Sequence, residues 1–380
     1  MSHLLVTNDF PPKTGGIQTY LWELWKRLPR SEAFVLTTSF PEANSWDLES
    51  PIEISRIPNK VMLPSRKLAR VIRDKAAELN VSHIIFDPAF PVGLLGSHIG
   101  LPYSIIVHGA ELTVPARLPI LKNLLAGEVQ RSIGIIAAGG YPALEVQRLI
   151  HRKKRIPVRV VMPGVDTSRF VPLSSEQKIQ ARVRLNIEPH IQVVTSISRL
   201  VPRKGMDTLI LASSTLKLKY PHLKVLIGGA GRDQKRLESM VAKTRAPVQF
   251  LGEIKHEQLP EIYGASDLFV MACRDRWAGL EQEGFGVVFL EAAACGIPQI
   301  AGSSGGSHEA VADGISGLVL ENSSDPAELA AKISYFLDNP EIRSQMGSAA
   351  RHRAEQEFGY DYLSEGLFEV IKEFENSIPK

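Results

Sequence analysis

Residues 3–28 read HLLVTNDFPPKTGGIQTYLWELWKRL, which predicts a strand, a loop and a helix in direct succession. The mostly apolar and β-branched run His3–Thr7 is typical of a buried strand. Two prolines end that strand, and Gly15 with Gly16 gives the backbone freedom to turn. Apolar residues then recur at helical spacing over Ile17–Leu28. Because the first amides of a helix have no partner inside it, this loop is a candidate anion site.

The same alternation continues through the first half of the chain. Short apolar runs predict strands at 34–37, 52–57, 82–86, 103–107, 133–138 and 159–161, and helical patterns lie between several of them, at 66–79, 119–131 and 143–151. Alternating strands and helices favour a parallel sheet covered on both faces, with ligands at the carboxyl ends of the strands. His108 follows such a strand, so it is either a site residue or a histidine satisfied by local hydrogen bonds.

The second half repeats this architecture with a different sequence. Strands are predicted at 191–197, 224–227, 248–251, 267–271 and 298–301, and helices at 178–185, 206–216, 233–242, 259–265, 326–337, 340–355 and 360–374. An aperiodic stretch at 167–175, which holds Pro172, predicts a domain boundary. We therefore expect an α/β chain of two Rossmann-like, doubly wound domains, residues 1–168 and 169–357, with a ligand cleft between their strand ends.

Composition and charge limit the class of protein. The chain has 380 residues, 44% of them hydrophobic and 22% charged, which is ordinary for a soluble globular protein. The first residues lack the pattern of a signal peptide, no apolar run is long enough to span a bilayer, and two cysteines form no disulfide or metal pattern, so we expect a cytoplasmic protein. Residues 1–168 hold 20 Lys and Arg against 14 Asp and Glu, which favours an anionic partner or simply a solvated surface.

Part of that positive charge gathers on one predicted helix. Basic residues cluster over Arg66–Arg73 and are interleaved with Leu68, Val71 and Ile72. This pattern suggests a surface helix that binds anionic lipid, or a covering helix with a solvated face. A second basic run lies at 151–155.

Two cations suit a diphosphate. Arg199 and Lys204 lie five residues apart in the loop after the strand predicted at 191–197, with Arg203 beside them. A planar guanidinium and a compact ammonium together can bind a phosphoryl leaving group and stabilise its developing charge. The alternative is an ordinary basic surface loop. No spacing of acids and histidines indicates a metal site, so we expect these cations and helix amides to neutralise the diphosphate without a divalent ion.

The stretch EGFGVVFLEA at 283–292 places two glutamates around a predicted helix start. Gly284 and Gly286 would let the backbone approach a phosphate, and the helix amides from Val287 onward would point at it. Glu291 would lie roughly 7 Å along the axis, a distance that suits a ribose, and Glu283 would reach the sugar. Either glutamate alone is also explained by the helix dipole.

Together these motifs resemble retaining glycosyltransferases of the GT-B fold, family GT4, over nearly the whole chain. The similarity rests on Gly15-Gly16, on Ser198-Arg199-Leu200 running to Lys204-Gly205, and on the two glutamates followed by Gly296-Ile297-Pro298. Within the family it is nearest to the bacterial phosphatidylinositol mannosyltransferases that use GDP-mannose, as the segments at 8–18 and 276–281 indicate. The fold implies that a C-terminal helix at about 358–380 packs back on the first domain.

The resemblance implies roles for matching residues. The first domain would bind the acceptor, through Asp9, Gln18 and His108. The second domain would bind the donor. The catalytic residues would be Arg199, Lys204 and Glu283 of the second domain and His108 of the first. Donor contacts would come from Gly15, Gly16, Arg199, Lys204, Gly252, Ile254, Glu283, Gly284, Phe285, Gly286, Val287 and Glu291. Transfer would retain the anomeric configuration by front-face attack, since no pair of acids suits a double displacement.

The resemblance also implies partners. We expect a nucleotide-sugar, a phosphatidylinositol-type lipid acceptor, an anionic membrane reached through the Arg66–Arg73 region, no nucleic acid, no cofactor, and a peripheral position on the inner face of the plasma membrane. The alternatives are a GT4 enzyme with another donor, such as UDP-glucose, or a soluble acceptor, and a non-catalytic nucleotide-sugar-binding protein. One departure is Gly305-Gly306-Ser307-His308-Glu309, where many relatives have proline in place of His308, so we expect a looser turn.

Overall fold

A computed structural model of the protein describes all residues except 1, 151–155, 278, 379 and 380. The second basic run predicted at 151–155 therefore lies outside the described residues. The chain forms two compact units: unit 1 is Met1–Pro163 with Tyr360–Lys380, and unit 2 is Gly164–Gly359. The division falls before the expected Ser168 because Val165 N donates to Phe358 O (2.8 Å), which ties this segment to unit 2.

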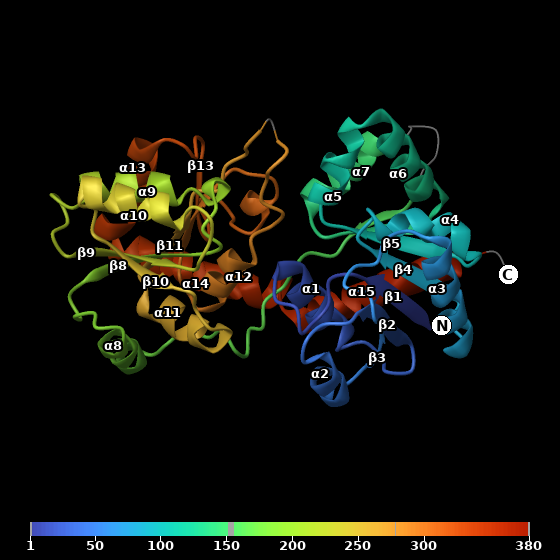
Figure 1. Ribbon diagram of the computed structural model, residues 1–380. Coiled ribbons are helices and arrows are strands. Elements are labelled where there is room, and N and C mark those ends of the chain that lie inside the picture. Colours follow the sequence, from blue (N-terminus) through green and yellow to red (C-terminus); the bar gives the residue numbers. More distant parts are fainter. Residues whose placement is uncertain (1, 151–155, 278, 379–380) are drawn as a thin grey trace. The chain divides into compact units, whose positions relative to one another are not determined.

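Unit 1 is built on a parallel sheet of seven strands (Figure 1). The strands are β1 (His3–Thr7), β2 (Ala33–Thr38), β3 (Glu53–Ile57), β4 (His83–Asp87), β5 (Tyr103–Val107), β6 (Gly134–Ala137) and β7 (Val158–Val160). Their order is β3-β2-β1-β4-β5-β6-β7, so the direction of winding reverses between β1 and β4. Each strand lies within two residues of its predicted range, because buried parallel strands are short and nearly continuous apolar runs.

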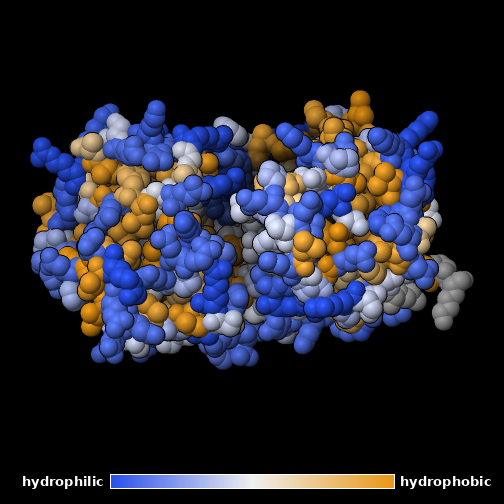
Figure 2. Space-filling model, turned by 60° about the horizontal axis from the view of Figure 1, so that its bottom comes forward, coloured by the Kyte–Doolittle hydropathy of each residue, from blue (hydrophilic) through white to orange (hydrophobic). Residues whose placement is uncertain are grey.

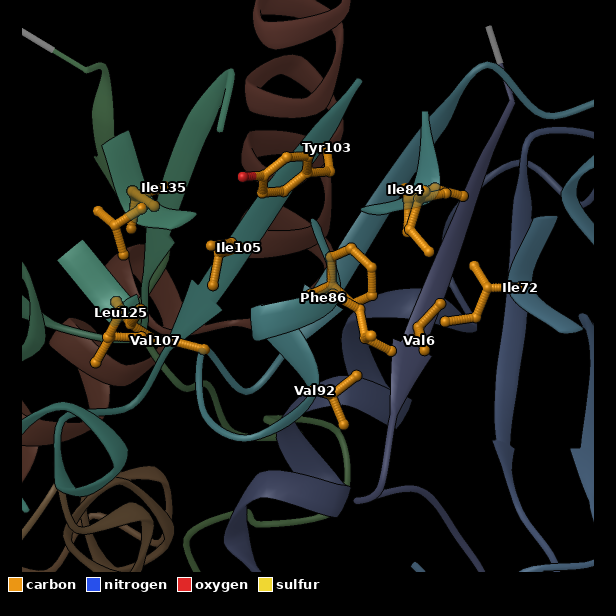
Figure 3. Close-up of a cluster of buried hydrophobic side chains, with 14 of the residues drawn as sticks. Val6, Ile72, Ile84, Phe86, Val92, Tyr103, Ile105, Val107, Leu125 and Ile135 are labelled. Atoms are coloured by element: carbon orange, nitrogen blue, oxygen red, sulfur yellow. The ribbon is translucent and has the colours of Figure 1, made fainter. Parts of the chain in front are cut away.

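Helices cover both faces of this sheet. On one face, α3 (Arg66–Glu78), α6 (Pro119–Arg131) and α7 (Gly140–Leu149) bury apolar residues against the strands, and Figure 3 shows Ile72 and Leu125 among strand side chains of this core. On the other face, α1 (Gly16–Trp25) packs with α15 (Tyr360–Asn376), so the C-terminal helix does pack back on the first unit as expected. The remaining short helical elements are α2 (Ala43–Glu49), η1 (Val92–Leu95), α4 (Gly96–Ile99), α5 (Ala110–Thr113) and η2 (Pro115–Arg117).

Unit 2 has the same strand order with one strand fewer. Its strands are β8 (Gln192–Ile197), β9 (Leu223–Gly228), β10 (Val248–Gly252), β11 (Leu268–Met271), β12 (Gln299–Gly302) and β13 (Gly317–Leu320), in the order β10-β9-β8-β11-β12-β13. The sequence did not predict β13, a four-residue edge strand with only its end residues buried. A strand so short and half-exposed gives too little apolar periodicity to be recognised.

The helices of unit 2 also lie on both faces of their sheet. One core contains α9 (Met206–Leu216), α10 (Gln234–Thr244) and α13 (Pro326–Asp338). Contacts between α8 (Ser175–Arg184) and α11 (Leu259–Ala265), and between α12 (Val287–Ala294) and α14 (Pro340–Glu357), form the other helical layer. In addition, η3 (Pro202–Lys204), η4 (His256–Gln258) and η5 (Ser307–Glu309) are single 3₁₀ turns. The prediction of two doubly wound Rossmann-like units is confirmed.

This topology determines where ligand-binding residues can gather. In each unit the chain reverses its winding beside the first strand, next to β4 in unit 1 and next to β11 in unit 2. Ligands of such sheets bind beyond the carboxyl ends of strands at this reversal. Within the described part of the chain, no helix is long and apolar enough to cross a membrane. Figure 2 accordingly shows hydrophobic and hydrophilic residues interspersed on the face that it draws.

Candidate active site

In unit 1, the ends of three adjacent strands bring together Thr7, Asp87 and His108. Thr7 and Asp87 are partners in register at the ends of β1 and β4, and Thr7 Oγ1 donates to Asp87 Oδ2 (2.7 Å). His108 directly follows β5, and its Nε2 donates to Asp87 Oδ1 (2.6 Å). The His108 backbone amide donates to Glu111 Oε1 (2.6 Å), which fixes the start of the loop. The imidazole is therefore oriented by a fully buried carboxylate.

The charge on His108 follows from this arrangement. Burial alone lowers the pKa of a histidine, but the Asp87 carboxylate outweighs it and the pKa of His108 is raised. Nearby, burial and the Asp87 charge raise the pKa of Asp9, which accepts from Gln18 Nε2 (2.7 Å). Asp9 and His108, both predicted to bind the acceptor, thus lie near the Asp87 carboxylate, Gln18 is bound to Asp9, and a positive imidazole is stabilised there.

The glycine pair opens α1 close to Gln18. Gly15 is the residue before the helix, and a Cβ placed on it would lie 2.3 Å from Gln18 Oε1. A side chain at position 15 would therefore displace Gln18 from Asp9. A Cβ on Gly16 would have no neighbour within 4 Å, so the backbone at the helix start is accessible. This is the geometry expected of an amide site for an anion.

In unit 2, the centre of the predicted site is a buried ion pair. Lys204 Nζ lies 2.7 Å from Glu283 Oε2, and Arg203 Nη1 also pairs with that oxygen. Both Lys204 and Glu283 are buried. Burial by itself raises the pKa of Glu283, but Lys204 and Arg203 outweigh it, so the net shift is downward and the carboxylate is ionised. From the sequence, Arg203 was only a neighbour of Arg199 and Lys204. The spacing of residues along the chain could not predict that Arg203 pairs with Glu283.

Backbone contacts of three glycines fix both partners of this pair. Gly205 ends the turn η3 with φ of 70°, and a Cβ there would lie 2.0 Å from Ala272 O. On the other side, Gly306 N donates to Glu283 O (3.0 Å), and a Cβ on Gly305 would lie 2.0 Å from the same carbonyl. Close backbone packing, which only glycine permits, therefore positions Lys204 and Glu283.

The turn that holds Glu283 is not loosened by His308. His308 is exposed, while Ser304 N donates to Ser307 Oγ (3.0 Å) and Ser304 Oγ donates to Asp275 Oδ1 (2.7 Å). Arg353 from α14 donates to Glu309 O (3.0 Å). Serine side chains and an arginine thus restrain this turn in the absence of proline.

Arg199 differs from Lys204 in that its side chain is exposed. Neither a hydrogen bond nor an ion pair holds its guanidinium among the described residues. Its neighbours pack closely on the turn Gly228–Gly231: Cβ atoms on Gly229 and Gly231 would lie 2.0 and 2.3 Å from the carbonyls of Ser198 and Leu200. The guanidinium of Arg199 itself remains available to a ligand.

Gly252 and Ile254, two of the predicted donor contacts, lie beside the same turn. Gly229 N donates to Gly252 O (2.7 Å), and Ile254 Cδ1 lies 2.2 Å from where a Cβ of Gly228 would stand. Gly252 has φ of 70° and open space around its Cα. The ends of β8, β9 and β10 thus bring together Arg199, Gly252 and Ile254, which lie far apart in the sequence.

Glu291 lies in the same helix as predicted but in a different environment from Glu283. It occupies the fifth position of α12, accepts from Tyr263 OH (2.8 Å), and burial raises its pKa from 4.5 to about 6. No acid occupies the first turn of α12, so the helix dipole does not explain Glu291.

The predicted glycines lie directly before this helix. Gly286, with φ of 91°, is the residue before its first turn. Gly284 is exposed, and Phe285 is buried against Phe358. Val287 is the first helical residue and is only half-buried.

Several residues of the site were missed from the sequence. Asp87 and Tyr263 orient His108 and Glu291 but lie 21 and 28 residues away from them. Asp87 ends a strand, so its position at the carboxyl edge was a usable signal. Arg203 and Tyr263 had no such signal. Among the described residues, no group of three or more His, Cys, Asp or Glu is placed to hold a metal ion.

Solved structures with the same fold include a nucleotide complex and a glycosyltransferase. The Anabaena protein HepE, crystallised with UDP, superposes with a TM-score of 0.83 at 21% identity, covering 98% of this chain and 100% of its own. A glycosyltransferase from Rickettsia africae gives a TM-score of 0.81 at 19% identity, covering 99% of each chain. At these identities the likeness establishes the fold, which is GT-B.

Closer relatives define the family. Residues 177–353 match the family model "Glycosyl transferases group 1". A GDP-mannose-dependent monoacylated alpha-(1-6)-phosphatidylinositol monomannoside mannosyltransferase from Corynebacterium glutamicum is 32% identical, over 97% of each chain. A GDP-mannose-dependent alpha-(1-6)-phosphatidylinositol monomannoside mannosyltransferase from Mycolicibacterium smegmatis is 34% identical, over 92% of this chain and 93% of its own. The chain belongs to the group 1 glycosyltransferases and is 32–34% identical to these two mannosyltransferases of the family.

Proposed function

We propose that this chain is a retaining mannosyltransferase that transfers mannose from GDP-mannose to a phosphatidylinositol mannoside lipid. The observation that carries the proposal is the identity of 32–34% with enzymes of that specificity, which extends over 92–97% of the chain. Identity over the full length includes the parts of both units that would bind donor and acceptor. The ion pair between Lys204 and Glu283 supports a donor site in unit 2.

In the proposed donor site, positive charge comes from cationic side chains and from the amides at the start of a helix. Arg199 is exposed and unpaired among the described residues, so it can close on a diphosphate. Lys204 is held by Glu283, and an ammonium has three donors, so it can contact a phosphate oxygen while keeping that partner. The amides at Gly286 and Val287 add partial positive charge. Glu291 would accept the ribose hydroxyls, and Gly252 with Ile254 would contact the base.

In the proposed reaction, the bond between the mannose anomeric carbon and the phosphate oxygen breaks as the acceptor hydroxyl attacks the same face. The proton of that hydroxyl passes to the departing phosphate oxygen. Arg199 and Lys204 would stabilise the negative charge on the diphosphate. Glu283 would fix the sugar through its hydroxyls. His108, oriented by Asp87, would contribute positive charge or a hydrogen bond beside the reacting sugar.

For the acceptor we propose contacts from Asp9 and Gln18. Their mutual hydrogen bond leaves the second carboxylate oxygen and the amide oxygen for a polyol. An inositol ring presents adjacent hydroxyls that can donate to these two acceptors. Gly15 and Gly16 would lie against donor phosphates at the start of α1.

We also propose that no divalent metal is required. The support is the cationic character of the site, since Arg199, Arg203 and Lys204 supply positive charge where a metal would otherwise act. The test is transfer measured with excess EDTA and with added Mg²⁺ or Mn²⁺. Loss of activity in EDTA that Mg²⁺ restores would reject this proposal while leaving the donor assignment intact.

The membrane contact proposed at Arg66–Arg73 is supported by charge alone. Arg66, Lys67, Arg70 and Arg73 are exposed, but Leu68 and Ile72 are buried in the core of unit 1. The apolar stripe of α3 thus covers the sheet, and its basic face is the part of the helix left for anionic lipid. A pocket of about 550 Å³ beside this helix is lined by its three arginines and by His98. We propose that this basic face binds anionic headgroups at the inner face of the plasma membrane.

The deciding experiment is a panel of donors and acceptors with product analysis. GDP-mannose, GDP-glucose, UDP-glucose and ADP-glucose would each be offered with phosphatidylinositol monomannoside or inositol 3-phosphate. Mannosylation of the lipid with GDP-mannose is expected. A D-inositol 3-phosphate glycosyltransferase from Salinispora arenicola is 29% identical over 94% of this chain, so turnover of inositol 3-phosphate alone would favour a soluble acceptor. Donor binding without turnover would favour a non-catalytic binding protein.

A further inference from the structure

The segment α5–η2–α6 exposes an unusual number of large apolar side chains. Ile120 is 76% exposed, and Val114, Leu118 and Leu124 are each more than half exposed. Leu144, on the neighbouring α7, is exposed as well. Single exposed apolar residues are ordinary, but four within eleven residues of chain are not. We call Val114, Leu118, Ile120, Leu124 and Leu144 the apolar ridge.

The ridge is not needed for the fold. Helix α6 already buries Leu125, Ala126 and Val129 in the core of unit 1. Ile120 and Leu124 are four residues apart, so they share a second side of the helix that faces away from that core. A surface helix normally has one apolar stripe and a polar opposite side. The second apolar side of α6 is therefore not explained by packing in the core of unit 1.

Cations surround the ridge. Arg117, Lys122 and Arg148 are exposed and line a pocket of about 430 Å³ together with Pro119 and Leu149. From Leu112 to Arg131 the only acid is Glu128, which is buried and accepts from Ser97 Oγ (2.7 Å) and Tyr103 OH (3.0 Å). On α7, Glu145 pairs with Arg148. The ridge and its rim thus combine exposed apolar groups with an excess of positive charge.

We propose that this surface inserts into an anionic phospholipid bilayer, as a second lipid contact separate from the basic face of α3. The apolar ridge enters the boundary of the acyl chains, and Arg117, Lys122 and Arg148 contact headgroup phosphates. The charge argues for this occupant, because a second copy of the same basic surface would repel the first. The inference deepens the proposed function and rests on it only in that the acceptor is a membrane lipid.

The two contacts differ in their response to salt. Binding through α3 is electrostatic and weakens as ionic strength rises, because exposed charges are screened beyond about 10 Å at 0.1 M salt. Insertion of the ridge buries apolar surface and is less sensitive to salt. Wild-type protein is therefore expected to keep part of its vesicle binding at 0.5 M NaCl.

The first test compares vesicle sedimentation of two triple variants. Leu118→Ser/Ile120→Ser/Leu124→Ser changes only exposed side chains, and Ile179→Ser/Val183→Ser/Leu218→Ser is a matched control in unit 2. With vesicles of phosphatidylcholine and phosphatidylglycerol at 0.5 M NaCl, the ridge variant is expected to lose about tenfold or more in partition coefficient, about 1.4 kcal/mol. The control is expected to bind like wild type. Equal binding of the ridge variant would overturn the proposal.

The second test reports insertion directly. Cys273 and Cys295 are buried, so a cysteine at Ile120 can be labelled selectively with an environment-sensitive fluorophore. Its emission is expected to shift to the blue on anionic vesicles, whereas a label at Leu48, 87% exposed on α2, is expected to stay unchanged. No shift at position 120, or a shift caused by raising the protein concentration without lipid, would overturn the proposal in favour of a self-interface.

Transfer to acceptor dispersed in detergent separates this inference from the proposed function. The ridge variant is expected to keep wild-type turnover there and to lose it on vesicles. If wild-type protein shows no transfer in detergent, the proposed function fails while the sedimentation result still judges the ridge.

Discussion

The ammonium of Lys204 lies 2.7 Å from the carboxylate of Glu283, although 79 residues separate them, and both side chains are buried. Arg203 pairs with the same oxygen, so two cations surround one anion and leave a local positive charge. Such a site can attract an anionic ligand, and when no ligand is bound the charges of Lys204, Arg203 and Glu283 are still paired with one another.

Removing the cations tests the site most directly. Lys204→Ala and Arg199→Ala are each expected to lower kcat by about 100-fold or more, the usual effect of losing one donor that stabilises developing charge. Arg199→Ala should leave the free energy of unfolding unchanged because its side chain is exposed, whereas Lys204→Ala should reduce it by leaving Glu283 with one partner. Single-turnover kinetics and urea denaturation measure the two effects. Near-normal turnover in both variants would contradict the phosphate role.

Comparing Gly205→Ala with Gly314→Ala separates the cost of a steric clash from the cost of a left-handed backbone conformation. A Cβ on Gly205 would lie 2.0 Å from Ala272 O, and φ there is 70°. We expect a loss of roughly 2–4 kcal/mol in the free energy of unfolding, the sum of left-handed strain and overpacking. Gly314→Ala is the matched control, because φ is 72° and no atom lies within 4 Å of its Cβ. It should lose only about 1 kcal/mol. Equal losses in the two variants would show that the contact with Ala272 is unimportant.

Glu291→Gln is expected to stabilise the protein at neutral pH. Because burial raises the pKa of Glu291 to about 6, the protonated group contributes stability below pH 4.5 that is lost as pH rises through 6. The neutral glutamine should therefore raise the free energy of unfolding at pH 7 by up to about 2 kcal/mol and have little effect at pH 4.5. Glu365→Gln, exposed on α15, is the control and should have no effect. Destabilisation at pH 7 would mean that the carboxylate is needed for folding.

Two buried histidines are expected to weaken the protein in acid. Burial lowers the pKa of His3 to about 3, and burial also lowers that of His83 despite Glu375 nearby. A lowered histidine pKa leaves stability intact above pH 6.5 and reduces it as pH falls, because the unfolded chain binds the proton first. With a pKa of about 3, His3 should lower the free energy of unfolding by about 2 kcal/mol at pH 5. His3→Leu is expected to flatten the pH dependence, and the exposed His352→Gln is not. An unchanged slope for His3→Leu would exclude His3 as the cause.

Much of the fold could be read from periodicity. Buried parallel strands such as β1 and β5 are continuous apolar runs, and helices such as α9 repeat apolar residues at helical spacing, so local sequence specifies them. The short edge strand β13 and helix α2, whose only buried residue is Ala43, gave no such signal. The apolar residues of α3 were noted correctly, but periodicity cannot say whether they face the core or a membrane.

The sequence by itself determined that this chain alternates strands and helices, that glycines open α1 and α12, and that Glu283 and Glu291 flank a helix start. Only the tertiary structure decided that Lys204 and Arg203 neutralise Glu283, that Asp87 orients His108 and that Tyr263 binds Glu291. The physical reason is that local spacing specifies elements of the chain, whereas these pairs form between the ends of strands or helices that the sheet order brings together.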